Sequence, residues 1–71
     1  MNEEKAHFVI YIINEVANRH ALYPSHVFKV MEETGCITDY LVPFYDVLHT
    51  MSSSSVVDDV EEYVRTRGAA L

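Results

Sequence analysis

Residues 3–20 read EEKAHFVIYIINEVANRH, and this stretch decides the fold class. Its apolar side chains recur at the helical period, at Val9, Ile12, Ile13 and Val16, and His20 ends the same face. Further residues widen this face on both sides: Ala6, Phe8, Ile10 and Ala17. The six-residue apolar run 8–13 is also compatible with a buried strand, but the polar residues on both sides of it keep the helical phase. We therefore predict a helix over Glu3–His20, with Asn2 as its N-terminal cap.

The second and third predicted helices are joined by a short turn. Proline is tolerated at the first helical position and glycine commonly follows the last, so we predict a helix over Pro24–Thr34. A third helix is predicted over Asp39–His49, with Thr38 as its cap. Pro43 lies inside it and lacks the N–H that a helix interior needs. Two alternatives stay open: the helix kinks at Pro43, or residues 39–42 form a separate turn and Pro43 starts the helix.

The third helix has the clearest apolar pattern in the chain. One stripe, expected to face the core, contains Ile37, Tyr40, Leu41, Phe44, Leu48 and Met51. Side chains three and four residues apart share a helix face, so a single continuous helix places all of them on one side. The pattern therefore predicts that this whole stripe is buried.

A fourth helix is predicted over Val56–Arg67, after the serine run 52–55, which we expect to be a loop. Ser55 and Asp58 have the spacing of a capping box. Cations in the last turn, followed by Gly68, favour a helix end there. Together these segments predict an all-α fold, a small bundle of about four helices that forms a single domain over residues 1–71.

The charge of the chain limits which functions are compatible with it. The formal net charge is −6, from 11 acidic and 5 basic residues. A surface that binds phosphates needs clustered cations, so nucleic acid is disfavoured and a protein partner with a basic face is favoured. The apolar runs are far shorter than the roughly 20 residues of a membrane span, and the first residues do not read as a signal peptide. We therefore expect a cytoplasmic protein that does not enter a membrane.

Candidate catalytic and metal-binding residues are few. The single cysteine, Cys36, excludes an internal disulfide, and a lone cysteine between two helices is more typical of packing than of a nucleophile. The histidines have no pair at the one-turn spacing that lets two ligands converge: His7, His20, His26 and His49. That spacing is the usual signature of helical metal sites. We therefore predict a non-enzymatic protein without a cofactor or a metal ion.

Exposed tyrosines and acids are the predicted partner-binding residues. Partly exposed tyrosine is enriched at protein interfaces, and an acidic run suits a basic partner. The predicted contacts are Tyr11, Tyr45, Asp46, His49, Asp58, Asp59, Glu61 and Glu62. The wide apolar helix faces also allow a homo-oligomer.

The second and third helices also have the spacing of a helix-turn-helix, which gives a DNA-binding regulator as the alternative function. The outward face of the would-be recognition helix carries Asp39 and Asp46 and no Lys or Arg. Carboxylates that face phosphates count against DNA binding.

Three segments resemble a family of very short bacterial proteins: 39–41 (DYL), 45–50 (YDVLHT) and 57–63 (VDDVEEY). The family is catalogued only as domain of unknown function 3791, and YDVLHT is the most specific part of a likeness that covers nearly the whole chain. Pro43 departs from the family's usual pattern. The resemblance implies a small helical protein without an assigned activity. Genes of this family are arranged like toxin–antitoxin pairs, often beside the gene of a protein that resembles ADP-ribosyltransferases. The resemblance therefore implies that this chain is the antitoxin-like or accessory partner of such a protein.

Overall fold

Helix α1 (Glu3–His20) is the longest element of the computed structural model, which describes all residues from 1 to 71. Its N-terminus is capped by Asn2, whose side-chain oxygen accepts the N–H of Lys5 at 2.8 Å. The helix ends where Ala21 adopts a left-handed conformation (φ 54°). Its buried side is formed by Val9, Ile12, Ile13, Val16 and Ala17. The predicted bounds and cap of this helix are confirmed, and most of its predicted inner face is buried or half-buried, but Ile10 and His20 are exposed.

Helix α2 (Pro24–Glu33) follows after a short turn and agrees with the prediction to within one residue. Thr34 closes it, because its hydroxyl donates to the carbonyl of Val30 at 2.9 Å. Gly35 is left-handed (φ 80°) and redirects the chain, as predicted from its position after the helix.

The predicted continuous helix over Asp39–His49, capped by Thr38, is wrong. The structure has instead a π-helix, η1 (Cys36–Leu41), and a separate four-residue helix, α3 (Tyr45–Leu48). In η1 the N–H of Val42 donates to the carbonyl of Ile37, five residues earlier, at 3.0 Å. Pro43 has no N–H to continue this ladder, so the chain turns before α3 begins. The second of the two alternatives is therefore the closer one, with the helix starting just beyond Pro43.

Helix α4 (Ser53–Thr66) begins earlier than predicted. Ser52 is its cap: the Oγ atom of Ser52 accepts the N–H of Ser55 at 3.2 Å. The prediction of a loop over residues 52–55 and of a Ser55–Asp58 capping pair is therefore wrong. Any serine of the run can serve as a cap, and Asp58 is engaged elsewhere by Arg19.

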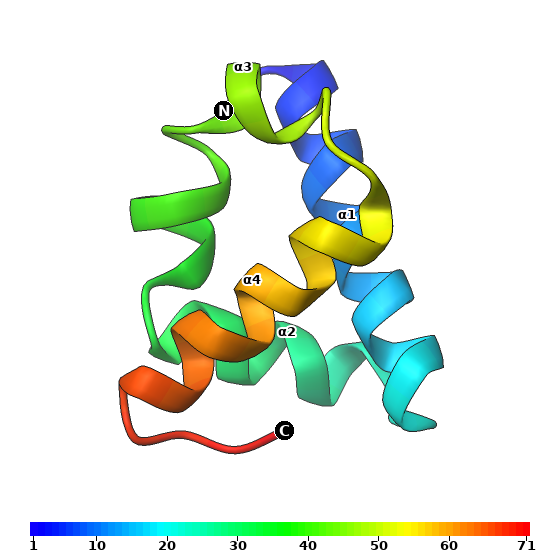
Figure 1. The fold of residues 1–71 in the computed structure, drawn as a ribbon, viewed down its shortest axis with the longest axis vertical. Helices are drawn as coiled ribbons and strands as arrows, with labels where there is room; N and C mark the ends of the chain where they lie inside the picture. Colours follow the sequence, from blue (N-terminus) through cyan, green and yellow to red (C-terminus); the bar gives the residue numbers. More distant parts are fainter.

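The helices enclose one apolar core, and Figure 1 shows how they are arranged around it. Helix α2 and helix α4 both pack against α1, while η1 packs against α2 and α4. The short α3 lies at the end of the molecule where α1 begins (Figure 1). All 16 buried residues are hydrophobic, and every helix contributes to them. The prediction of a small all-α bundle is confirmed, and none of its helices is both long and apolar enough to span a bilayer.

Candidate interaction surface

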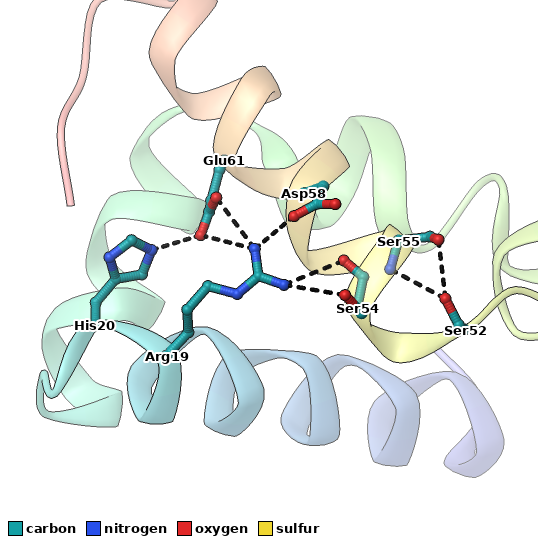
Figure 2. Close-up of polar contacts among 7 residues, drawn as sticks. All are labelled: Arg19, His20, Ser52, Ser54, Ser55, Asp58 and Glu61. Carbon is teal, nitrogen blue, oxygen red and sulfur yellow. Dashed lines mark hydrogen bonds and ion pairs between the residues drawn. The ribbon is translucent and has the colours of Figure 1, made fainter.

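A cluster of charged side chains joins the end of α1 to α4, and we call it the Arg19 clamp: Arg19, His20, Asp58 and Glu61. The guanidinium of Arg19 lies 2.5 Å from Asp58 and 3.3 Å from Glu61. It also donates to the carbonyl of Ser54 at 3.3 Å, as Figure 2 shows. The hydrogen bond to Asp58 and the charge of Glu61 raise the pKa of Arg19. The imidazole Nε2 of His20 lies 2.5 Å from Glu61.

The other two predicted acids of α4 also have partners within the chain. Glu62 pairs with Arg65 one turn further along the same helix. Asp59 points to η1 and accepts the hydroxyl of Tyr40 at 3.3 Å. The acidic run is therefore not one free surface, because its side chains contact three different elements.

Stacked rings connect η1 to the C-terminal half of α4. Tyr40 stacks on Tyr63 with ring centroids 5.4 Å apart, and its ring centroid lies 6.0 Å from that of Phe44. The guanidinium of Arg67 lies 3.6 Å from the Tyr63 ring centroid, within the range of a cation–π contact. Burial raises the pKa of Tyr40 to about 12, with the nearby charge and hydrogen bond of Asp59 adding to the effect.

The predicted residues of α3 lie at the opposite end of α1 from the Arg19 clamp. Tyr45 packs edge-on against Phe8 of α1, with ring centroids 5.4 Å apart. His49 stacks on Tyr45 at 4.6 Å, and its Nδ1–H donates to the Tyr45 carbonyl at 2.8 Å. Asp46 is exposed between them. Tyr11 is half exposed near the middle of α1, about one helical turn after Phe8.

Most of the predicted partner-binding residues fall into two groups, whereas Asp59 faces η1 and Glu62 pairs with Arg65. The first group, Tyr45, Asp46 and His49, lies on α3 and its C-terminal cap near the start of α1, and Tyr11 lies near the middle of α1. Asp58 and Glu61 lie where α1 ends, and both are held by Arg19. Phe8 and Arg19 are separated along α1 by roughly 16 Å at the helical rise per residue, so the two groups do not form one surface.

An exposed apolar stripe on and beside α3 was not predicted, and we call it the α3 stripe: Phe44, Val47 and Met51. Their exposed fractions are 53%, 62% and 38%. Phe44 and Met51 were expected in the core, and that prediction is wrong. The break at Pro43 gives the residues beyond it a new helical phase, in which Leu48 alone of α3 is buried. A proline inside an apparently regular stripe was the signal that could have warned of this change.

Negative charge is concentrated in one part of the chain. Residues 30–64 contain no Lys or Arg, and their acids are Glu32, Glu33, Asp39, Asp46, Asp58, Asp59, Glu61 and Glu62. Ion pairs with arginine take up Asp58, Glu61 and Glu62. The acids that remain without an ion pair are Glu32, Glu33, Asp39, Asp46 and Asp59. The uncompensated charge therefore lies over the end of α2, η1 and α3, with one residue from α4.

The geometry does not assemble the catalytic or DNA-binding arrangements weighed from the sequence. The Cys36 thiol is fully buried, and burial raises its pKa to about 12, so it is protonated and out of reach of solvent. No three His, Cys, Asp or Glu side chains converge as metal ligands. A recognition helix needs a continuous element to enter the major groove, whereas η1 and α3 are short and separated by a turn at residues 42–44.

Taken together, the fold and the surface define a small all-α protein in which the unpaired acids of residues 30–64 lie over the end of α2, η1 and α3, with one from α4, and in which α3 leaves apolar side chains exposed. The family model described as Protein of unknown function (DUF3791) matches residues 7–67, and the chain therefore belongs to this family. The match covers most of α1 and all of the later helices, and it confirms the resemblance drawn from the DYL, YDVLHT and VDDVEEY segments. No curated protein and no solved structure matches the chain.

Proposed function

We propose that this protein is a non-enzymatic module that binds a protein partner with a basic face. The observation that carries the proposal is the uncompensated negative charge of residues 30–64, in which only three of the acids are paired with arginine. Charge of one sign, concentrated on one part of a small protein, speeds encounter with a partner of opposite charge and rejects partners of the same sign.

The side chains beside this charge support the same proposal. Aromatic residues and methionine are enriched at protein interfaces. Tyr11 and the α3 stripe place such side chains at the surface, and the half-buried Tyr45 stacks on the exposed His49. The family resemblance supports a finer form of the proposal, in which the partner resembles an ADP-ribosyltransferase and this chain is its antitoxin-like or accessory protein.

The first experiment is capture of the partner with the tagged chain from a native lysate at moderate salt, followed by mass spectrometry. The captured protein is then purified, and its affinity is measured by calorimetry at low and high salt. We expect a stoichiometric complex with a basic protein, whose affinity falls as salt rises because screening shortens the reach of surface charges to about 8 Å at physiological ionic strength. Recovery of the chain alone, or an affinity that salt does not change, contradicts the proposal.

Two variants that replace acids by neutral amides test which part of the chain attracts the partner. Asp39→Asn with Asp46→Asn removes two unpaired charges of residues 30–64, and we expect weaker binding and a smaller salt dependence. The matched control, Glu4→Gln with Glu15→Gln, removes the same charge from α1, outside this region, and should leave the affinity nearly unchanged. A gel shift at low salt tests the DNA-binding alternative on the same material, and a shift at micromolar protein favours it.

A further inference from the structure

We infer that helix α4 is a strap held on the core by the Arg19 clamp, and that α4 lifts from α1 and η1 while the other helices stay packed once the clamp is released. This inference goes beyond the proposed function and does not rest on it, because it concerns motion within the chain. It gives the clamp the role of a latch, whereas the sequence assigned Asp58 and Glu61 to a partner.

Helix α4 has little helical stability of its own. Its 14 residues include four valines, three serines and a threonine, which are weaker helix formers than alanine or leucine. Its acids also oppose helix formation: Asp58 precedes Glu61 by three residues and Glu62 by four, the spacings at which like charges meet on one helix face. Isolated helices shorter than about 12–15 residues are marginal in water, so α4 depends on its contacts with other elements.

Those contacts consist of an apolar face and the clamp. The apolar face is buried in the core: Val56, Val57, Val60 and Val64. The clamp supplies polar ties to α1, since the guanidinium of Arg19 lies 2.5 Å from Asp58 and 3.3 Å from Glu61. It also donates to the carbonyl of Ser54 at 3.3 Å (Figure 2). Residues 54–61 span roughly 10 Å along the helix axis, so one side chain ties about two turns of α4 to the end of α1.

The clamp counteracts the repulsion within α4 as well as tethering the helix. Arg19 places a positive charge beside both Asp58 and Glu61, the acids that repel each other across one turn. The Nε2 atom of His20 lies 2.5 Å from Glu61 at the same junction. Because the interaction of charges weakens with distance, a cation this close offsets the repulsion between the two acids. Loss of the Arg19 charge therefore weakens α4 both as a helix and as a neighbour of α1.

The path of the chain lets α4 lift without separating the other helices. Helix α1 packs against α2, and α2 packs against η1, and neither of these contacts involves α4. In chain order α4 follows all three of these elements (Figure 1). The stack of Tyr63 on Tyr40 joins α4 to η1 and has to separate in the same opening. The opening therefore exposes the apolar face of α4 and leaves α1, α2 and η1 in contact.

Native-state hydrogen exchange on the ¹⁵N-labelled full chain tests the inference. In the unchanged protein, we expect the amides of α4 to exchange through an opening that leaves the amides of α1 and α2 protected. Arg19→Gln should raise the opening constant of α4 about fivefold, with a smaller change in the most protected amides of α1. Equal protection of α4 and α1 in the unchanged protein contradicts the inference, because α4 then opens only with the whole fold.

Two further variants separate a latch from a general loss of positive charge. Asp58→Asn added to Arg19→Gln removes the repulsion that Arg19 offset, and we expect it to restore part of the lost protection of α4. Lys29→Gln removes the same charge from an exposed position of α2, and it should leave the protection of α4 unchanged. The amide spectrum of each variant shows directly whether the fold is kept.

Salt provides a readout that a simple loss of packing does not give. In Arg19→Gln, salt at about 1 M shortens the reach of charges to about 3 Å and screens the repulsion left in α4. The protection of α4 relative to α1 should then rise, whereas in the unchanged protein the same salt weakens the clamp and the ratio should not rise. An equal loss of protection in all helices of Arg19→Gln, no recovery with Asp58→Asn, or the same loss in Lys29→Gln overturns the inference.

Discussion

Replacement of Leu48 by alanine tests whether α3 is anchored as the structure indicates. Leu48 is the only buried residue of this four-residue helix. At about 0.8 kcal/mol for each buried carbon, removal of the side chain beyond Cβ costs about 2.4 kcal/mol by transfer alone. A cavity that does not collapse adds to this and brings leucine-to-alanine losses up to about 5 kcal/mol. Because α3 is short and can settle inward, we expect a loss near the lower figure.

Urea unfolding followed by circular dichroism measures this loss. A domain of this size is stable by roughly 4–10 kcal/mol, so the variant should lose a large fraction of its stability and its unfolding midpoint should fall clearly. The matched control is Val47→Ala, one residue earlier on the same helix, where 62% exposure predicts a change within about 0.5 kcal/mol. Equal stability of the two variants would show that α3 is not packed on the core.

Three further predictions concern the turn, the thiol and the alkaline limit of stability. Gly35→Ala should destabilise the fold by about 1 kcal/mol or more in thermal melts, because φ is +80° and an added Cβ lies 2.6 Å from the Asp39 carboxylate. Gly68→Ala is the control, because Gly68 has the same φ but open space around it, and it should lower the stability less. Cys36 should react with a thiol reagent at pH 8 only as fast as the protein unfolds, and rapid modification of the native state would contradict its burial. Tyr40 has its pKa raised from 10.0 to about 12 in the folded state; the folded protein therefore holds this proton more tightly than the unfolded chain, and stability should fall as the pH rises through that window. The fall in stability between about pH 10 and about pH 12, measured from urea midpoints, should be smaller in Tyr40→Phe than in the unchanged protein.

The sequence predicts α1 and α2 well because their determinants are local. Asn2 is the right residue type immediately before a periodic apolar segment, and its hydrogen bond to Lys5 lies within one turn. Gly35 takes the left-handed conformation because it lacks a Cβ, which can be anticipated from the residue itself. Capping and periodicity act over a few residues, so a reading of the linear sequence captures them.

The region from residue 36 to 55 is where local rules compete, and there the sequence prediction fails. The stripe that includes Phe44 and Met51 fits one helix, but Pro43 cannot supply the N–H that the helix requires. The chain resolves the conflict with a π-helical turn and a restarted helix, which turns Phe44 outward. The extra residue of a π-turn changes every later side-chain direction, and periodicity alone does not reveal it.

The acids of α4 show a second limit of sequence reasoning, and this limit matters for function. Asp58 and Glu61 read as a solvent-facing charge run, yet they contact Arg19, which is 39 and 42 residues away in the chain. A count of charges assigns them to a partner, whereas the fold uses them to join α4 to the end of α1. Once these internal pairs are set aside, the unpaired acids of residues 30–64 lie over the end of α2, η1 and α3, with Asp59 from α4. The same Pro43 that interrupts the helical pattern leaves Phe44, Val47 and Met51 outside the core.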